Sequence, residues 1–117
     1  MSAADETRDS TDGPSRDELD AMREAVLIEF GAAHCGHCRA AQPLIAQALE
    51  QHRAVRHIKV EDGPGRRLGR SFRVKLWPTL VFMREGGEVA RLVRPADAQS
   101  IAEALSRIDG GAAEGGS

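Results

Sequence analysis

The stretch EFGAAHCGHCRAAQP, residues 29–43, contains both cysteines of this 117-residue chain. Cys35 and Cys38 are separated by two residues and stand between an apolar run and a segment of helical character. A C-x-x-C pair near a β-α-β pattern is typical of a redox motif. The same pair could supply half of a zinc site, because a structural zinc ion takes four ligands. A third interpretation is that two small residues lie close together by chance.

A redox role requires that one cysteine ionises easily. A thiol attacks only as the thiolate, and the pKa of a free cysteine is about 8.5. If Cys35 begins a helix, the unpaired N–H groups of the first turn and the positive end of the dipole point at its sulfur. A protonated His37 adds positive charge beside it. Cys38 then lies within reach to resolve a mixed disulfide formed on Cys35.

A metal site would need ligands from the four histidines, His34, His37, His52 and His57. The two that flank the cysteine pair stand too close to it for good tetrahedral closure, and no second ligand pair follows at regular spacing. Redox chemistry is therefore preferred over metal delivery through Cys35, Cys38 and His37. We expect no metal and no cofactor apart from the redox-active disulfide.

The segments around the cysteines predict an α/β domain with a mixed sheet flanked by helices. The apolar run AVLIEF predicts a buried strand, and the helix after the cysteines contains Pro43, where a kink is expected. The first two strands are expected to be parallel, and the last two to form a hairpin at Gly86 and Gly87. The predicted elements are a helix at 16–24, a strand at 25–30, a helix at 36–51, a strand at 54–60, a short helical piece at 66–74, strands at 79–85 and 89–95, and a helix at 96–108.

Length and composition predict one domain at 15–109, a disordered tail at 1–14 and a flexible tail at 110–117. Ser15 and Glu18 fit a capping box at the start of the first helix. The net charge of −2 does not indicate nucleic acid, and no run of 18 apolar residues predicts a membrane span. The acidic, polar N-terminus differs from a signal peptide, so a cytoplasmic monomer is expected.

Several motifs in order resemble the thioredoxin family over residues 16–108. They are VLIEF before the cysteines, CGHC at 35–38, Pro43, WPT at 77–79, GEV at 87–89 and the final helix. The resemblance implies the thioredoxin fold and dithiol–disulfide exchange with disulfide-containing protein substrates. It also implies a reductase or thiol donor that returns the electrons.

The resemblance assigns roles to individual residues. Cys35 would be the exposed nucleophile, and Cys38 the more buried resolving thiol. Pro78 matches the cis-proline of the family, which keeps a backbone edge beside the sulfurs for an extended substrate peptide, and Thr79 follows it as in the family. The other interpretation of Pro78 is an ordinary trans proline at the start of a strand.

Glu29, in the middle of an apolar run, matches the buried acid of the family. Without a strong partner its pKa would be raised, and it could take the proton of Cys38. The other interpretation is a carboxylate that faces the edge of the sheet. His57 stands where thioredoxin usually has a lysine, and it is either a partner of Glu29 or a partly buried strand histidine.

Departures from the family pattern lie on the substrate-facing rim. HCGHC replaces the usual WCGPC, Gly31 stands where a second tryptophan is common, and Arg94 stands near a frequent glycine. The residues expected to contact substrate are His34, Trp77, Pro78 and Thr79. The dipeptide between the cysteines resembles that of protein disulfide isomerases, in which a histidine stabilises the thiolate and makes the disulfide more oxidising.

The expected function is therefore that of a thiol–disulfide oxidoreductase, more oxidising than a typical thioredoxin. The unusual Trp77 and the basic stretch at 66–75 leave a second hypothesis, a thioredoxin-fold binding or adaptor module with little turnover. That stretch otherwise fits the solvated face of a helix.

Overall fold

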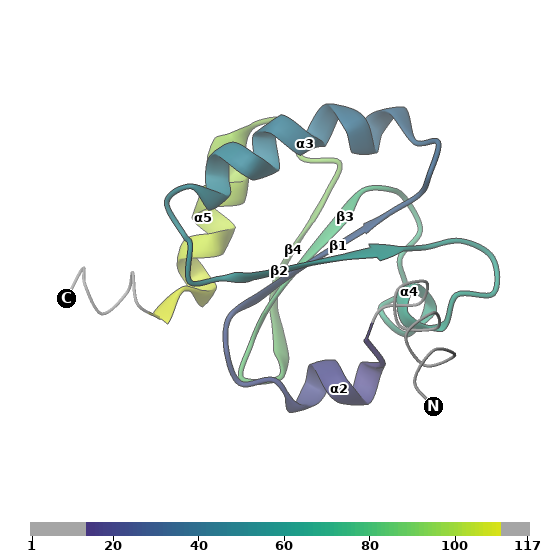
Figure 1. Ribbon diagram of the computed structural model, residues 1–117, viewed down its shortest axis with the longest axis horizontal. Helices are drawn as coiled ribbons and strands as arrows, with labels where there is room; N and C mark the ends of the chain where they lie inside the picture. Colours follow the sequence, from purple (N-terminus) through teal and green to yellow (C-terminus); the bar gives the residue numbers. More distant parts are fainter. Residues whose placement is uncertain (1–13, 111–117) are drawn as a thin grey trace, which may run out of the picture.

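The computed structural model describes residues 14–110, and within this range four strands form one mixed sheet with helices on both faces (Figure 1). The strands are β1 (Val26–Gly31), β2 (Arg56–Glu61), β3 (Thr79–Arg84) and β4 (Gly87–Val93), in the order β2-β1-β3-β4. The predicted parallel β1–β2 pair and antiparallel β3–β4 hairpin are confirmed. The tails predicted at 1–14 and 110–117 lie outside the described residues except for Pro14 and Gly110.

The helices are α2 (Arg16–Ala21), α3 (Gly36–Leu49), α4 (Arg67–Ser71) and α5 (Ala98–Ile108). Helices α3 and α5 cover one face of the sheet, while α2 and α4 lie on the other (Figure 1). Helix α3 continues through Pro43. None of the helices within residues 14–110 combines the length and the apolar character needed to cross a membrane.

Several elements end earlier than their patterns predicted. The first helix stops at Ala21 instead of 24, because the backbone of Met22 is already extended. Helix α4 ends well before 74, since Arg73 has a positive φ of 56°. Strand β4 ends at Val93 because Arg94, with a φ of 51°, leaves the extended conformation. A positive φ is incompatible with continuing either a right-handed helix or a strand.

Strand β1 lies between β2 and β3 and is buried on both faces. Its odd-numbered positions Leu27 and Glu29 face α3 and α5, while Val26, Ile28 and Phe30 pack toward α2 and α4. Each fully buried aliphatic or aromatic side chain of this kind contributes about 1.5–3 kcal/mol. Glu29 is buried because β1, the strand that contains it, lies in the centre of the sheet.

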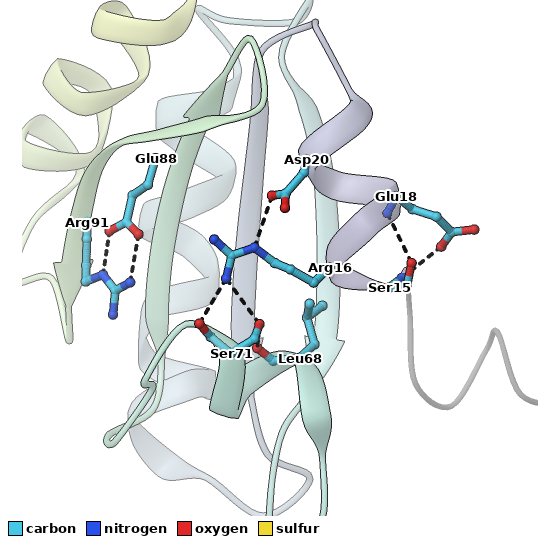
Figure 2. Close-up of polar contacts among 8 residues, drawn as sticks. All are labelled: Ser15, Arg16, Glu18, Asp20, Leu68, Ser71, Glu88 and Arg91. Carbon is cyan, nitrogen blue, oxygen red and sulfur yellow. Dashed lines mark hydrogen bonds and ion pairs between the residues drawn. The ribbon is translucent and has the colours of Figure 1, made fainter.

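Helix α2 is fixed at its start and then tied to α4 (Figure 2). The predicted capping box is confirmed: the Ser15 hydroxyl accepts from the Glu18 N–H at 3.1 Å, and the Glu18 carboxylate accepts from the Ser15 N–H at 2.8 Å. Arg16 donates to the Ser71 carbonyl at 2.9 Å and lies over the Phe72 ring at 3.9 Å. These contacts hold the short α2 against the sheet face opposite α3.

The hairpin between β3 and β4 turns at Glu85 and Gly86, which have φ values of 56° and 77°. Two positive φ values are characteristic of the tight turns that match the twist of paired strands. A Cβ at Gly86 would lie 2.2 Å from the backbone oxygen of Asp20, so the position admits only glycine. The predicted hairpin is confirmed, but its turn lies one residue earlier than the glycine pair, and Gly87 already belongs to β4.

Candidate active site

Cys35 occupies the N-cap position of α3, directly after the loop that follows β1. Its Sγ accepts a hydrogen bond from the backbone N–H of Cys38 at 3.1 Å. A sulfur therefore takes the place of the serine or aspartate oxygen that usually satisfies the first N–H groups of a helix. The arrangement expected from the sequence, a sulfur facing the electropositive start of a helix, is present.

The two cysteines are free thiols with opposite properties. Burial alone would raise the pKa of Cys35, but hydrogen bonds from Cys38 and from the His37 N–H, together with the charge of Arg94, bring this pKa below its ordinary value. Burial raises the pKa of Cys38 to about 11, and the hydrogen bond and charge of Cys35 and the charge of Glu29 act in the same direction. Cys35 is partly exposed and Cys38 is buried. The site therefore pairs an easily ionised sulfur with one that keeps its proton.

The loop before β3 forms one wall of the site. The Trp77–Pro78 peptide bond is cis, as the resemblance implied, and the Trp77 carbonyl oxygen lies 3.9 Å from Cys35 Sγ. The Trp77 indole Nε1 donates to Asp62 at 2.9 Å. The Thr79 hydroxyl donates to a backbone carbonyl of the same loop at 2.6 Å. These bonds fix the backbone of the loop beside Cys35 Sγ.

Glu29 lines the same pocket as Cys38 and is only 4% exposed. One carboxylate oxygen lies 2.8 Å from His57 Nε2, and the other accepts a hydrogen bond from the Gln42 amide. The same Gln42 amide donates to the backbone carbonyl of Cys38 at 3.1 Å. Lys59 Nζ donates to the Gln42 side-chain oxygen at 3.2 Å. Gln42 thus connects the buried acid to Cys38.

The raised pKa predicted for Glu29 is wrong. Burial does raise it, but the hydrogen bonds from His57 and Gln42 and the charges of His57 and Lys59 outweigh burial, so the pKa lies below its ordinary value. The prediction assumed a carboxyl group without strong partners. His57 is such a partner, and the alternative in which Glu29 faces the edge of the sheet does not hold. Gln42 was not anticipated, although its position four residues after Cys38 places both on one helix face.

Three further residues lie at the rim of the site. His34 and His37 are exposed on either side of Cys35. The contribution of His37 seen here comes from its backbone N–H, so the role expected for its ring remains a prediction. Arg94, noted in the sequence as a departure from the family, donates from Nε to the Trp77 carbonyl at 2.8 Å.

A pocket opens beside the cysteines and is bordered by Gly31. A Cβ at this position would lie 3.1 Å from Cys38 Sγ, so a side chain here would press on that sulfur. The charged and polar residues that line the pocket are Glu29, Arg39, Gln42, Lys59 and Glu61. The pocket therefore reaches from solvent to both the buried acid and the buried thiol.

The histidines considered as metal ligands have other partners or stand apart. His52 Nδ1 lies 2.8 Å from Asp109, and His57 lies against Glu29. In the part of the chain that the structure describes, no group of three His, Cys, Asp or Glu side chains is placed to hold a metal ion. The geometry gives metal delivery no support.

Comparison with known proteins agrees with this geometry. The sequence pattern of the thioredoxin family matches residues 9–107. The chain is 40% identical over 95 residues to human protein disulfide-isomerase A2, covering 74% of this chain and 18% of that protein. It is 30% identical over 83 residues to thioredoxin H2-1 of Oryza sativa subsp. japonica, covering 71% and 59% respectively. The chain thus spans less than a fifth of the isomerase.

Among solved structures, reduced thioredoxin 2 from Pseudomonas aeruginosa PAO1 superposes with a TM-score of 0.76 and 56% identity. The match covers 86% of this chain and 94% of that one. The chain therefore belongs to the thioredoxin family of thiol–disulfide oxidoreductases, whose members act on disulfide-containing protein substrates. Both the family and the fold that the sequence predicted are confirmed.

Proposed function

We propose that this chain is a thiol–disulfide oxidoreductase in which Cys35 and Cys38 exchange a dithiol for a disulfide with protein substrates. The observation that carries the proposal is the placement of the two sulfurs within one helical turn. Cys35 Sγ is partly exposed at the start of α3, where it accepts the Cys38 N–H at 3.1 Å and lies 3.9 Å from the Trp77 carbonyl oxygen, while Cys38 is buried. The pKa is lowered at Cys35 and raised to about 11 at Cys38, in keeping with this placement. One sulfur is ready to attack, and the other holds its proton until a mixed disulfide has formed.

The reaction proceeds in two exchanges. The Cys35 thiolate attacks a substrate disulfide, a bond forms between Cys35 and one substrate sulfur, and the other substrate sulfur leaves as a thiolate. Cys38 then loses its proton and attacks Cys35 Sγ, which forms the Cys35–Cys38 disulfide and releases the second substrate thiolate. Two electrons pass to the substrate. A reductase or thiol donor returns them to the chain by the reverse sequence.

We assign Glu29 the task of accepting the Cys38 proton. Its lowered pKa keeps it ionised at neutral pH, and it lines the same pocket as Cys38. A lowered pKa also makes it a weak base, so the thiol must become easier to ionise first. Capture of Cys35 in a mixed disulfide removes the Cys35 charge, which is one cause of the raised pKa of Cys38. Proton transfer is then easiest at the step that needs it.

Apolar side chains next to the cis peptide bond support a protein substrate. Leu76 and Val93 are each 47% exposed, and Val93 pairs in register with Thr79. Exposed apolar residues beside a fixed backbone segment suit the docking of an extended peptide. They place the reactive sulfur of the substrate near Cys35.

Reduction of insulin disulfides by dithiothreitol tests the proposal. We expect Cys35→Ser to abolish catalysis and Cys38→Ser to stop turnover while it still forms a mixed disulfide with substrate. In the wild-type chain at neutral pH, iodoacetamide should modify Cys35 and spare Cys38. Full activity of Cys35→Ser would contradict the proposal. A reversible redox couple without turnover would instead favour the binding-module hypothesis.

We further propose that the couple is more oxidising than that of a typical thioredoxin, because His37 occupies the dipeptide between the cysteines. Its potential should lie above about −270 mV and toward the isomerase value of about −180 mV. Equilibration with glutathione measures it, with His37→Pro as the matched variant, for which we expect a more reducing couple. A wild-type potential at or below that of thioredoxin removes the argument from His37.

A further inference from the structure

Arg94 lies at the mouth of the site, and apart from its charge near Cys35 the exchange steps above give its side chain no role. It follows Val93 directly at the end of β4. Its Nε donates to the Trp77 carbonyl oxygen at 2.8 Å, and Cys35 Sγ lies 3.9 Å from that same oxygen. The guanidinium therefore covers a backbone acceptor that faces the nucleophile.

The backbone of Arg94 is also unusual. Its φ of 51° lies in the left-handed region, which glycine adopts without strain and which other residues adopt less often. Its N–H donates to the Pro78 carbonyl at 2.9 Å, which fixes its place beside the cis peptide bond. An arginine thus stands where the conformation favours glycine, and its side chain is turned onto the substrate-facing loop.

The terminal nitrogens of Arg94 remain available. Within residues 14–110 neither of them has a hydrogen-bond or ion-pair partner. Two acids of the site have other partners, Glu29 with His57 and Gln42, and Asp62 with the Trp77 indole. A guanidinium fork with free terminal N–H groups matches a carboxylate.

We propose that Arg94 selects substrates that carry a carboxylate beside their reactive disulfide, by covering the Trp77 carbonyl until such a group draws the guanidinium away. A peptide that pairs with this loop must displace the Arg94–Trp77 hydrogen bond to reach the carbonyl. A neutral peptide loses that bond without replacement. A peptide with an acidic neighbour gives the guanidinium a new partner and keeps the carbonyl accessible. The inference rests on the proposed function, since it concerns the same exchange reaction.

Two peptide disulfides that differ only in glutamate or glutamine next to the cysteine provide the test. We compare kcat/KM for both peptides in the wild type, Arg94→Gln and Arg94→Lys. The ratio of the two values does not depend on how much of Cys35 is ionised, because both peptides meet the same thiol. The wild type should prefer the glutamate peptide about fivefold, as expected for a partly exposed ion pair.

Arg94→Gln should bring the ratio close to one and lower the KM of the neutral peptide, while the loss of its charge near Cys35 affects the thiolate that meets both peptides alike. Arg94→Lys keeps the charge and should keep most of the preference. Arg73→Gln is the matched control, since Arg73 is another exposed arginine with a positive φ, 56°, and its ratio should equal that of the wild type. At 1 M salt, where the Debye length is about 3 Å, the wild-type preference should shrink.

A wild type that reduces both peptides equally well, or an Arg94→Gln variant that keeps the preference, would overturn the role of Arg94 while the proposed function stands. A wild type that reduces neither peptide would contradict the proposed function, and the role of Arg94 would fall with it.

Discussion

Two histidine–carboxylate pairs with the same nitrogen–oxygen distance occupy different parts of the molecule. His57 Nε2 lies 2.8 Å from a carboxylate oxygen of Glu29, near the first turns of α3. His52 Nδ1 lies 2.8 Å from a carboxylate oxygen of Asp109, just beyond the C-terminal end of α3. In the first pair the histidine side chain is 26% exposed, while in the second both side chains are 7% exposed. The first pair therefore reaches solvent through His57, whereas both members of the second pair are enclosed.

The surroundings of the second pair fit a structural role. The His52 N–H bonds to the Leu49 carbonyl at the end of α3, and Asp109 is the C-cap of α5, with its N–H on Leu105. The pair therefore joins the ends of the two helices that cover one sheet face. Arg84 adds a hydrogen bond to the Ile108 carbonyl at 2.8 Å in the same region.

The largest expected effect comes from breaking this second pair. Asp109→Ala leaves His52 buried without its carboxylate, and we expect a loss of about 3 kcal/mol in the free energy of unfolding. The activity of the folded protein should not change, because neither residue contacts the cysteines. Urea unfolding and the insulin assay at low temperature measure the two quantities. Glu103→Ala, an exposed acid on the same helix, is the control and should change neither.

An unchanged unfolding free energy in Asp109→Ala would show that the pair contributes little to stability. A loss of activity without a loss of stability would mean that the two pairs are not functionally distinct.

The sequence predicts one of these pairs better than the other. Hydrophobic runs and turn residues gave the order of elements and the parallel pairing of β1 with β2, because those depend on local periodicity. That pairing puts Leu27 opposite His57 and Glu29 opposite Lys59, so an acid and a histidine on neighbouring strands could be expected to meet. His52 and Asp109 lie in a loop and at a helix end, and their contact depends on how α3 packs on α5.

The electrostatics of Glu29 were less predictable than its position. An acid in an apolar run indicates burial, and burial alone raises a carboxyl pKa. The sign of the net effect depends on how many donors reach the carboxylate, and Gln42 comes from α3, outside the strand pattern. The contact of Arg94 could not be predicted from the sequence either, because its guanidinium reaches Trp77 only through the turn of the chain after β4.

The first pair is tested by Glu29→Gln, which has the second-largest expected effect. Glutamine keeps the shape and a hydrogen-bonding group but cannot accept the Cys38 proton, so turnover at neutral pH should fall about 100-fold. Alkylation of Cys35 should change little, since the first exchange does not use Glu29. Quenched-flow measurement of the mixed disulfide should show that it accumulates. Unimpaired resolution, or a defect confined to the attack by Cys35, would remove Glu29 from the mechanism.

The smallest effect concerns the pH dependence of stability. The pKa of Glu29 is lowered in the folded state, so its contribution is complete above the ordinary value of 4.5 and is lost as pH falls through the lower folded value. His57→Gln removes one cause of the lowering, which brings the folded pKa nearer to 4.5 and reduces the contribution at neutral pH by up to about 1 kcal/mol. The variant should therefore lose less stability than the wild type between about pH 5 and pH 3.

Urea unfolding of the wild type, His57→Gln, Glu29→Gln and the double variant across this pH range completes a double-mutant cycle. If the acid-sensitive part of stability comes from the contact between His57 and Glu29, removal of His57 in the Glu29→Gln background should leave the pH profile unchanged. A further change in that background would assign the effect to another acid near His57. It would also mean that the partly exposed His57 does not keep Glu29 ionised. The pair of His57 and Glu29 would then no longer differ in this respect from the enclosed pair of His52 and Asp109.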